Sequence, residues 1–260
     1  VDYGIFEIGL GGRYDAANVM DPAVSLITPI ALDHTGYLGP TVKEIAGEKA
    51  RIARAGRTLI TTATEAALEV IRDYAGEIGA VLHVVDTPCR ERTSLKGAGQ
   101  AMNAGLALRA AHELGFRPDG ERIAYALNTA FLPGRIEEIG DRVTLDVAHN
   151  PAAMAVLMEY LEQKGFHGVG VFGVLADKDF QTMMEMMKKT CSRVYIAPVQ
   201  SDRSWGDAEM EGCLDGERVV RCESVTRAFH QALGTGEAVV VTGSFYTVGE
   251  IREALVCTGF

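Results

Sequence analysis

Two apolar runs near the amino end of the chain lead into side chains that can do chemistry. Residues 4–19 read GIFEIGLGGRYDAANV, in which one run reaches Glu7 and then a glycine-rich loop. Residues 25–39 read SLITPIALDHTGYLG, in which a second run leads to His34. The carboxyl ends of parallel strands meet at one edge of a sheet, so we expect Glu7 and His34 to lie near each other. A carboxylate and an imidazole are acceptable ligands for a divalent cation that bridges phosphates.

The glycine-rich loop is a weak signal by itself. It matches neither the GxGxxG dinucleotide fingerprint nor the GxxxxGK[ST] phosphate loop, and neither pattern occurs elsewhere in the chain. A tight turn with a solvated Glu7 therefore remains an alternative. The role of Lys49 also has two interpretations, because Lys49 shares a helical face with Ile45 and Ile52. A lysine beside an apolar stripe commonly extends its amine into water.

Apolar runs alternate with helical patterns in the first half, which indicates parallel βαβ construction. Thr41 begins one expected helix, 41–55, as its N-cap, with Glu44 in capping-box register. The expected strands lie near 3–8, 24–31, 58–62 and 81–86. Two successive helices are expected at 99–115 and 119–131, followed by the LPGR turn at 132–135.

The alternation is more regular in the second half and predicts a doubly wound domain. Strands are expected near 143–148, 168–175, 193–198, 219–222 and 238–243. Helices are expected near 152–164, 179–190, 224–234 and 246–256. We place the domain boundary so that it separates 1–136 from 137–260.

Composition favours small-molecule chemistry in the cytoplasm. The 260 residues are 47% hydrophobic and carry a formal net charge of −10, which disfavours nonspecific binding to nucleic acid or an anionic membrane. No apolar stretch reaches the roughly 18 residues of a membrane span, and the first residues lack a signal-peptide pattern. The cysteines are odd in number and form no CxxC pair, so neither a disulfide framework nor a zinc site is expected. They are Cys89, Cys191, Cys213, Cys222 and Cys257.

Six ordered motifs give the chain a specific resemblance. They read FEIGLGGRYDAANV, ITPIALDHTGYLGPTVKEIAGEKARI, LPGRIE, LDVAHNP, VFGVLADKD and TGSFYTVGEIR. In this order and spacing the chain resembles the folylpolyglutamate synthase/dihydrofolate synthase family of Mur-ligase-like enzymes. The resemblance implies an α/β fold: the remainder of a central ATPase domain with a parallel sheet, followed by a Rossmann-like carboxyl-terminal ligase domain.

The resemblance implies an ATP-dependent ligase. ATP phosphorylates a carboxylate of pteroate or folate, and the amine of L-glutamate then attacks the acyl phosphate. By similarity, Glu7 and His34 match the magnesium ligands, and Lys49 matches a lysine that is carbamylated in the family. His34 and Lys49 are therefore the expected catalytic residues. Magnesium would neutralise the polyphosphate charge during phosphoryl transfer.

The resemblance also assigns binding residues. The expected nucleotide contacts are Asn103, Arg135, Asp146 and His149. Arg135 offers a guanidinium fork to phosphate, and Asp146 at a strand end can accept from a ribose hydroxyl. The expected substrate contacts follow three strands of the second domain, where helix caps explain them nearly as well. They are Asp177, Lys178, Arg203, Ser204, Ser244 and Tyr246.

The chain departs from the family pattern most clearly in lacking a Gly-Lys-Ser phosphate loop. We therefore expect a truncated form with no ligase activity of its own. Intact members are expected to be monomeric, whereas this chain would associate through apolar surface. Gly99 stands where a polar residue usually precedes the helix of Asn103, and Arg51 replaces a glycine. Two alternatives remain: a noncatalytic relative that binds nucleotide or folate, and another Mur-type amino-acid ligase.

Overall fold

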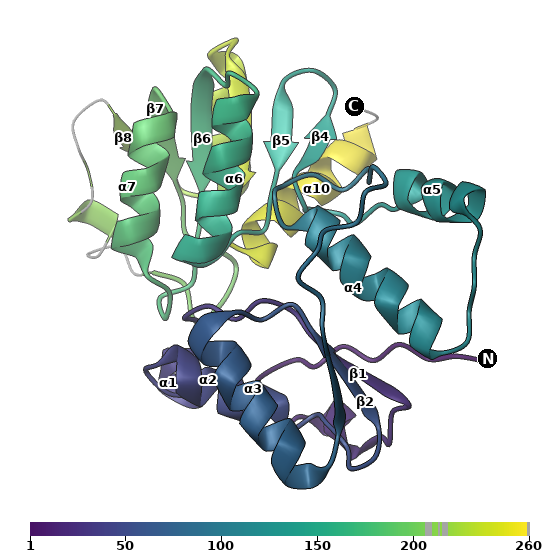
Figure 1. Cartoon of the computed structure of the whole chain (residues 1–260). Coiled ribbons are helices and arrows are strands. Elements are labelled where there is room, and N and C mark those ends of the chain that lie inside the picture. Colours follow the sequence, from purple (N-terminus) through teal and green to yellow (C-terminus); the bar gives the residue numbers. More distant parts are fainter. Residues whose placement is uncertain (206–209, 213, 215–217, 259–260) are drawn as a thin grey trace. The chain divides into compact units, whose positions relative to one another are not determined.

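The chain forms two compact units, one built around a parallel β-sheet and the other around a sheet that is parallel except for one strand pair (Figure 1). The structure is a computed structural model that describes residues 1–205, 210–212, 214 and 218–258, without the side chains of 256–258. Unit 1 comprises Val1–Ser94 and Gly99–Thr129, and unit 2 comprises Leu95–Ala98 and Ala130–Phe260. The α/β fold class expected from the sequence is confirmed.

Unit 1 holds a three-stranded parallel sheet in the order β1-β2-β3. Its strands are β1 (Val24–Ile27), β2 (Thr58–Thr61) and β3 (Val81–Val84). Its helices are the 3-10 turn η1 (Ala16–Val19), α1 (Thr35–Leu38), α2 (Val42–Ala50), α3 (Glu65–Ile78), α4 (Gln100–Glu113) and α5 (Gly120–Thr129). Leu59 packs in one buried cluster with side chains of α2 and α3. The next residue, Ile60, points to the opposite face and is fully buried, and α4 packs against β1 and β2.

The expected strand at 3–8 is wrong. Residues 1–8 belong to no strand, and the side chains of Ile5 and Phe6 are 99% and 61% exposed. A strand exists only where its backbone groups find a partner, and the one described neighbour of β1 is β2. An apolar run cannot supply that partner. The other three expected strands of unit 1 are confirmed, each shorter than expected.

Helix α2 begins where the sequence predicts. The hydroxyl of Thr41 accepts from the backbone N–H of Glu44, and the Glu44 carboxylate accepts from the N–H of Thr41. This reciprocal capping box satisfies two of the orphan donors at the helix start. The helix ends at Ala50, earlier than the expected 55. Helix α3 was not anticipated from the sequence.

Unit 2 holds a six-stranded sheet in the order β4-β5-β9-β6-β7-β8, in which only the β4–β5 pair is antiparallel. Its strands are β4 (Glu137–Ile139), β5 (Val143–Leu145), β6 (Gly168–Phe172), β7 (Arg193–Ile196), β8 (Val219–Arg221) and β9 (Ala238–Thr242). Its helices are α6 (Pro151–Gln163), α7 (Phe180–Thr190), α9 (Val225–Gly234) and α10 (Phe245–Thr258). Buried side chains of α6 and α7 share one core cluster, and those of α9 and α10 share a second. The doubly wound arrangement is therefore confirmed, with β4 as an unexpected edge strand.

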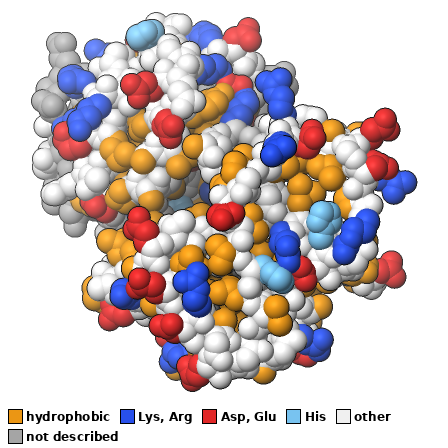
Figure 2. Space-filling view, in the orientation of Figure 1, with side chains coloured by type: hydrophobic (Ala, Val, Ile, Leu, Met, Phe, Trp, Pro, Cys, Tyr) orange, Lys and Arg blue, Asp and Glu red, His pale blue; other side chains and the backbone are white. Residues whose placement is uncertain are grey.

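The surface carries charged and apolar side chains together. Figure 2 shows acidic, basic and apolar side chains interspersed on the visible face.

Cys89, Cys191 and Cys222 are free thiols, and burial raises the pKa of Cys191 to about 12. Cys213 and the side chain of Cys257 lie outside the described residues. No helix in the described part of the chain is both long and apolar enough to cross a membrane.

The glycine-rich loop of unit 1 is organised by Asp15 and rests on the end of α2. The Asp15 carboxylate accepts from the N–H groups of Leu10, Ala17 and Gly9, each at 2.9 Å. These hydrogen bonds lower the pKa of Asp15. A Cβ on Gly12 would lie 2.7 Å from the carbonyl oxygen of Glu48, so only glycine permits this approach.

Arg54 ties the same loop to the carboxyl end of α2. Its Nη1 donates to the carbonyls of Arg51, Ile52 and Ala53 at 3.1–3.2 Å. Its Nη2 donates to the Asn18 side chain at 2.8 Å, to the Asn18 carbonyl and to the carbonyl of Met20 at 2.9 Å. One guanidinium thus satisfies carbonyls at a helix end and in the following loop.

Replacing Arg54 by Met should lower the free energy of unfolding of unit 1 by about 2 kcal/mol, because hydrogen bonds from a charged donor are lost. Urea titration followed by circular dichroism measures the change. Arg72→Met, on the exposed side of α3, makes the same chemical change and should stay within about 0.5 kcal/mol of the parent. Equal losses in the two variants would contradict the role given to Arg54.

Candidate functional site

The carboxyl ends of four neighbouring parallel strands in unit 2 carry most of the expected binding residues. The sheet order places β5, β9, β6 and β7 side by side. Each is followed by a turn that holds expected residues: 146–149, 244–246, 177–178 and 203–204 in that spatial order. In open α/β sheets this edge is the usual place for a ligand. The candidate site is defined here as this edge together with the LPGR turn.

The LPGR turn is fastened to the end of β5 through the backbone. Gly134 has φ +66°, and its carbonyl accepts from the N–H of Val147 at 2.9 Å. A Cβ on Gly134 would meet the Val147 side chain at 2.9 Å. A larger residue would therefore be strained both by this contact and by the positive φ. The N–H of Gly134 donates to Glu137, which in turn pairs with Arg252 at 3.0 Å. The main chain of Arg135 is thereby held on both sides.

Asp146 completes this attachment from a buried position. Its side chain accepts from the N–H of Ile136 and of Ala148, both at 2.8 Å, and the residue is only 8% exposed. Burial raises the pKa of Asp146, while the two hydrogen bonds and the charges of Arg135 and His149 act in the opposite direction. Each carboxylate oxygen keeps a second lone pair, so Asp146 can still accept a hydrogen bond from a hydroxyl group of a ligand.

Arg135, His149 and Phe245 form a contiguous group beside Asp146. The guanidinium carbon of Arg135 lies 5.5 Å from the ring centroid of Phe245, and the ring centroids of His149 and Phe245 are 5.7 Å apart. His149 Nδ1 lies 2.9 Å from the Val147 carbonyl. The sequence patterns do not single out Phe245. The available signal is a large apolar side chain directly after the Gly-Ser at a strand end, where exposure is expected.

Two expected substrate residues bind each other. Arg203 Nη2 donates to Asp177 Oδ1 at 2.7 Å, and the Arg203 carbonyl accepts from the N–H of Ala176. The turns after β6 and β7 are thus joined by a side-chain pair and a backbone bond. The Ser204 hydroxyl accepts from the N–H of Val199 at 3.0 Å, a structural use. Lys178 lies between the paired Asp177 and the N-cap Asp179 of α7.

Ser244 and Tyr246 flank the start of α10. Ser244 is 2% exposed, and its hydroxyl accepts from the N–H of Thr247 at 3.1 Å. This is the geometry of a helix cap, which supports the structural reading of this serine. Tyr246 is 47% exposed, so its ring remains accessible to a ligand. Asn150 likewise caps α6, whose first residue is Pro151.

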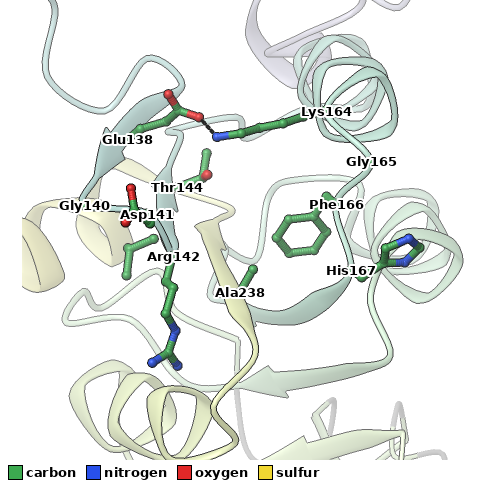
Figure 3. A pocket seen from close by; sticks show the side chains of 11 residues that line it. Glu138, Gly140, Asp141, Arg142, Thr144, Lys164, Gly165, Phe166, His167 and Ala238 are labelled. Atoms are coloured by element: carbon green, nitrogen blue, oxygen red, sulfur yellow. Dashed lines mark hydrogen bonds and ion pairs between the residues drawn. The ribbon is translucent and has the colours of Figure 1, made fainter.

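A hollow of about 240 Å³ lies at the other edge of the same sheet (Figure 3). It is lined by the starts of β5 and β9 and by residues 165–167, which precede β6. In Figure 3 the Glu138 carboxylate faces Lys164, and Glu138 also binds Lys96 and accepts from the Tyr160 hydroxyl at 2.9 Å. The hollow therefore does not coincide with the candidate site.

The expected metal and catalytic residues belong to unit 1. Glu7 is exposed and follows no strand, which removes the geometric reason for pairing it with His34. His34 lies beyond the end of β1, precedes α1, and has φ +51°, a costly conformation for a non-glycine residue. Its N–H donates to the Asp33 carboxylate at 2.8 Å. Among the described residues, no group of three or more His, Cys, Asp or Glu side chains is arranged to hold a metal ion.

Lys49 and Asn103 occupy half-buried helix positions in unit 1. Burial lowers the pKa of Lys49, and the charge of Asp33 partly offsets this. Asn103 lies in the first turn of α4 and donates to Gln100 at 3.2 Å. Gly99, the N-cap of α4, supplies no side-chain cap. The partly desolvated amine of Lys49 is therefore easier to deprotonate than an exposed lysine.

Asp146→Asn should alter the pH dependence of stability. The folded pKa of Asp146 is raised above 3.8, so ionisation of the buried carboxyl costs stability as pH rises through the acidic range. The variant lacks this cost. The difference in free energy of unfolding, variant minus parent, should therefore rise from pH 4 to pH 7. Urea titrations across this range measure it, with Asp141→Asn on an exposed carboxyl as the control; a difference that stays flat for Asp146→Asn contradicts the assignment.

Comparison with known proteins identifies the family. Residues 134–245 match the model of the Mur ligase glutamate ligase domain. A dihydrofolate synthase/folylpolyglutamate synthase from Bacillus subtilis is 31% identical over 98% of this chain and 68% of its own length. A probable bifunctional folylpolyglutamate synthase/dihydropteroate synthase from Halobacterium salinarum is 34% identical over 97% of this chain and 35% of its own length.

Solved structures agree with these relatives. A bifunctional folylpolyglutamate synthase/dihydrofolate synthase from Yersinia pestis, complexed with AMPPNP and Mn ion, superposes with a TM-score of 0.84. It is 32% identical, and the match covers 96% of this chain and 65% of that one. The chain thus spans about a third of the archaeal relative and about two thirds of the bacterial proteins. By sequence and by fold, the chain belongs to the folylpolyglutamate synthase/dihydrofolate synthase family.

Proposed function

We propose that this protein joins L-glutamate to dihydropteroate or to folate polyglutamates with ATP. A carboxylate oxygen of the pteroate or folate attacks the γ-phosphorus, and ADP leaves. The glutamate amine then attacks the acyl carbon, loses a proton and displaces phosphate. The observation that carries the proposal is the Arg135, Asp146 and His149 group at the strand edge of a Mur-type ligase domain.

The group suits a nucleotide chemically. No hydrogen bond or ion pair of the Arg135 guanidinium is found within the part of the chain that the structure describes, so its donors remain available to phosphate oxygens. Asp146 is proposed to accept a hydrogen bond from a ribose hydroxyl, and the His149 ring lies on the same edge. By family resemblance we also assign Asn103 of unit 1 a nucleotide-binding role.

By family resemblance, and not by their geometry here, Glu7 and His34 are the proposed protein ligands of Mg²⁺. A carboxylate and an imidazole fit a divalent cation whose other ligands are phosphate oxygens and water. When bound, the ion supplies charge neutralisation during phosphoryl transfer. The exposed side chain of Glu7 is accessible to such a complex. Lys49, with its lowered pKa, is proposed to form a carbamate, which would replace a cation near the metal by an anion.

The glutamate substrate is proposed to bind at the turns after β6, β7 and β9. Arg203 and Lys178 are the cations suited to its carboxylates. Because Arg203 already pairs with Asp177, an incoming carboxylate must share or displace that partner. Ser204, Ser244 and Tyr246 supply hydroxyl groups along the same edge. The two serine hydroxyls are already used in structural hydrogen bonds, so their contribution to binding is secondary.

The 260 residues contain no Gly-Lys-Ser phosphate loop, so we expect no turnover from them alone. A version extended at its amino end by a phosphate-loop segment should release ADP only when both glutamate and dihydropteroate or tetrahydrofolate are present. Transfer of ¹⁸O from the substrate carboxylate to phosphate would report the acyl phosphate. Glutamate-dependent ADP release by residues 1–260 alone would refute the expected inactivity.

The same assay separates the alternatives. A noncatalytic relative would bind nucleotide or folate without releasing ADP in either version. Another Mur-type ligase would release ADP with an amino acid other than glutamate. In an active extended version, Glu7→Gln and His34→Ala should each lower kcat by about 100-fold with little change in thermal stability. The surface variant Glu69→Gln should keep the parental rate; unaltered rates in the first two variants would exclude their role as metal ligands.

Lys49 should react with carbon dioxide more readily than an exposed lysine. The lowered pKa leaves more neutral amine near pH 8, and only the neutral amine attacks carbon dioxide. With ¹³C-bicarbonate, NMR should show a carbamate signal that Lys49→Arg removes. Lys43→Arg, on an exposed position of the same helix, should leave that signal unchanged. A signal that survives in Lys49→Arg would contradict the assignment.

A further inference from the structure

Phe245 occupies an unusual place for a large apolar side chain. It is the first residue of α10 and is 58% exposed. Its neighbours at the strand edge include Arg135, with the guanidinium carbon 5.5 Å from the ring centroid. The His149 ring lies 5.7 Å away at an interplanar angle of 42°. An exposed phenylalanine gains little from the hydrophobic effect, so its contacts with these two side chains call for a different explanation.

Backbone hydrogen bonds hold the chain beside Arg135, whereas its guanidinium contacts an aromatic ring. The residues on either side of Arg135 are bound to the end of β5, Gly134 through Val147 and Ile136 through Asp146. The contact that the structure gives its guanidinium is the Phe245 ring. Arginine loses rotamer entropy when its side chain is fixed. A neighbouring aromatic face reduces that loss at the moment of binding, because the guanidinium is already restricted.

The Arg135 guanidinium lies over the Phe245 ring. Asp146 attracts the Arg135 charge but directs both carboxylate oxygens at backbone N–H groups. The guanidinium therefore keeps its hydrogen-bond donors for an external acceptor while its planar face is supported. This division leaves the in-plane donor edge available, which is the edge that phosphate uses.

We propose that Phe245 is a positioning residue that holds the Arg135 guanidinium for a polyphosphate ligand. The proposal rests on the proposed function only in taking the phosphate of a nucleotide as the natural ligand. It adds that Phe245 acts through Arg135 and makes its contribution by its aromatic face, not by its volume. The expected benefit is that of a partly exposed cation–π contact, about a fivefold change in affinity.

The test is binding of inorganic tripolyphosphate to the 260-residue protein, measured by calorimetry without ATP or folate. Phe245→Ala and Phe245→Leu should each weaken binding about fivefold, and Phe245→Tyr should stay within about twofold of the parent. Arg135→Gln should weaken binding further. Adding Phe245→Ala to Arg135→Gln should then change nothing, because the ring acts through the arginine. Tyr125→Ala, which removes another exposed aromatic ring, is the matched control.

Five outcomes would count against the proposal. Parental affinity in Phe245→Ala excludes any role, and parental affinity in Phe245→Leu shows that volume alone matters. A further loss in the double variant shows that Phe245 does not act through Arg135. A wild-type protein that fails to bind tripolyphosphate removes the anion site itself. ADP serves as a parallel ligand: a loss confined to ADP indicates base stacking and also counts against the proposal.

This measurement is independent of the ligase reaction. Tripolyphosphate binding that follows the expected pattern supports the role of Phe245 even if no version of the protein releases ADP. Conversely, an active ligase whose Phe245 variants bind tripolyphosphate normally keeps the proposed function and loses this inference. Thermal unfolding of Phe245→Leu should match the parent, since the side chain is exposed and its volume is kept.

Discussion

The buried carboxylate of Asp146 is the interaction on which the candidate site depends. It accepts backbone hydrogen bonds from two chain segments, one directly after the LPGR turn, at Ile136, and one after β5, at Ala148. A charged acceptor makes stronger hydrogen bonds than a neutral one, but burial of the charge costs free energy. The raised pKa of Asp146 records that cost. The two hydrogen bonds offset part of this free-energy cost, and the one from Ile136 fixes the backbone next to Arg135 at the strand edge.

The two units use similar means to hold irregular loops. In unit 1, Asp15 gathers the N–H groups of the glycine-rich loop, and Arg54 gathers the carbonyls at the end of α2. In unit 2, Asp146 gathers N–H groups and Gly134 permits the close approach. A single charged side chain satisfies several backbone groups in each case. Such loops keep their shape without regular secondary structure, which is what a ligand-binding edge requires.

The side chains at the strand edge of unit 2 differ in how far they are already hydrogen-bonded or ion-paired within the protein. Asp177 and Arg203 form an ion pair, and Ser204 and Ser244 make structural hydrogen bonds. The Arg135 guanidinium, by contrast, is supported by an aromatic ring and keeps its donors. Under the proposed function this difference has a chemical meaning, because a site for phosphate needs a cation that is oriented but not neutralised. The hollow at the opposite edge has its central carboxylate, Glu138, bound by two lysines.

Local sequence determined much of this protein. The capping box at Thr41, the cap at Asn150 before Pro151 and the alternation of unit 2 depend on neighbouring residues, and all appear in the structure. The motifs also sufficed to identify the family. Tertiary structure decided what depends on distant partners. Residues 3–8 have the pattern of a strand but no strand partner. Arg203 pairs with Asp177 from a different turn. The role that we propose for Phe245 depends on its contact with Arg135. Strand pairing and side-chain contacts are long-range, so no local pattern specifies them.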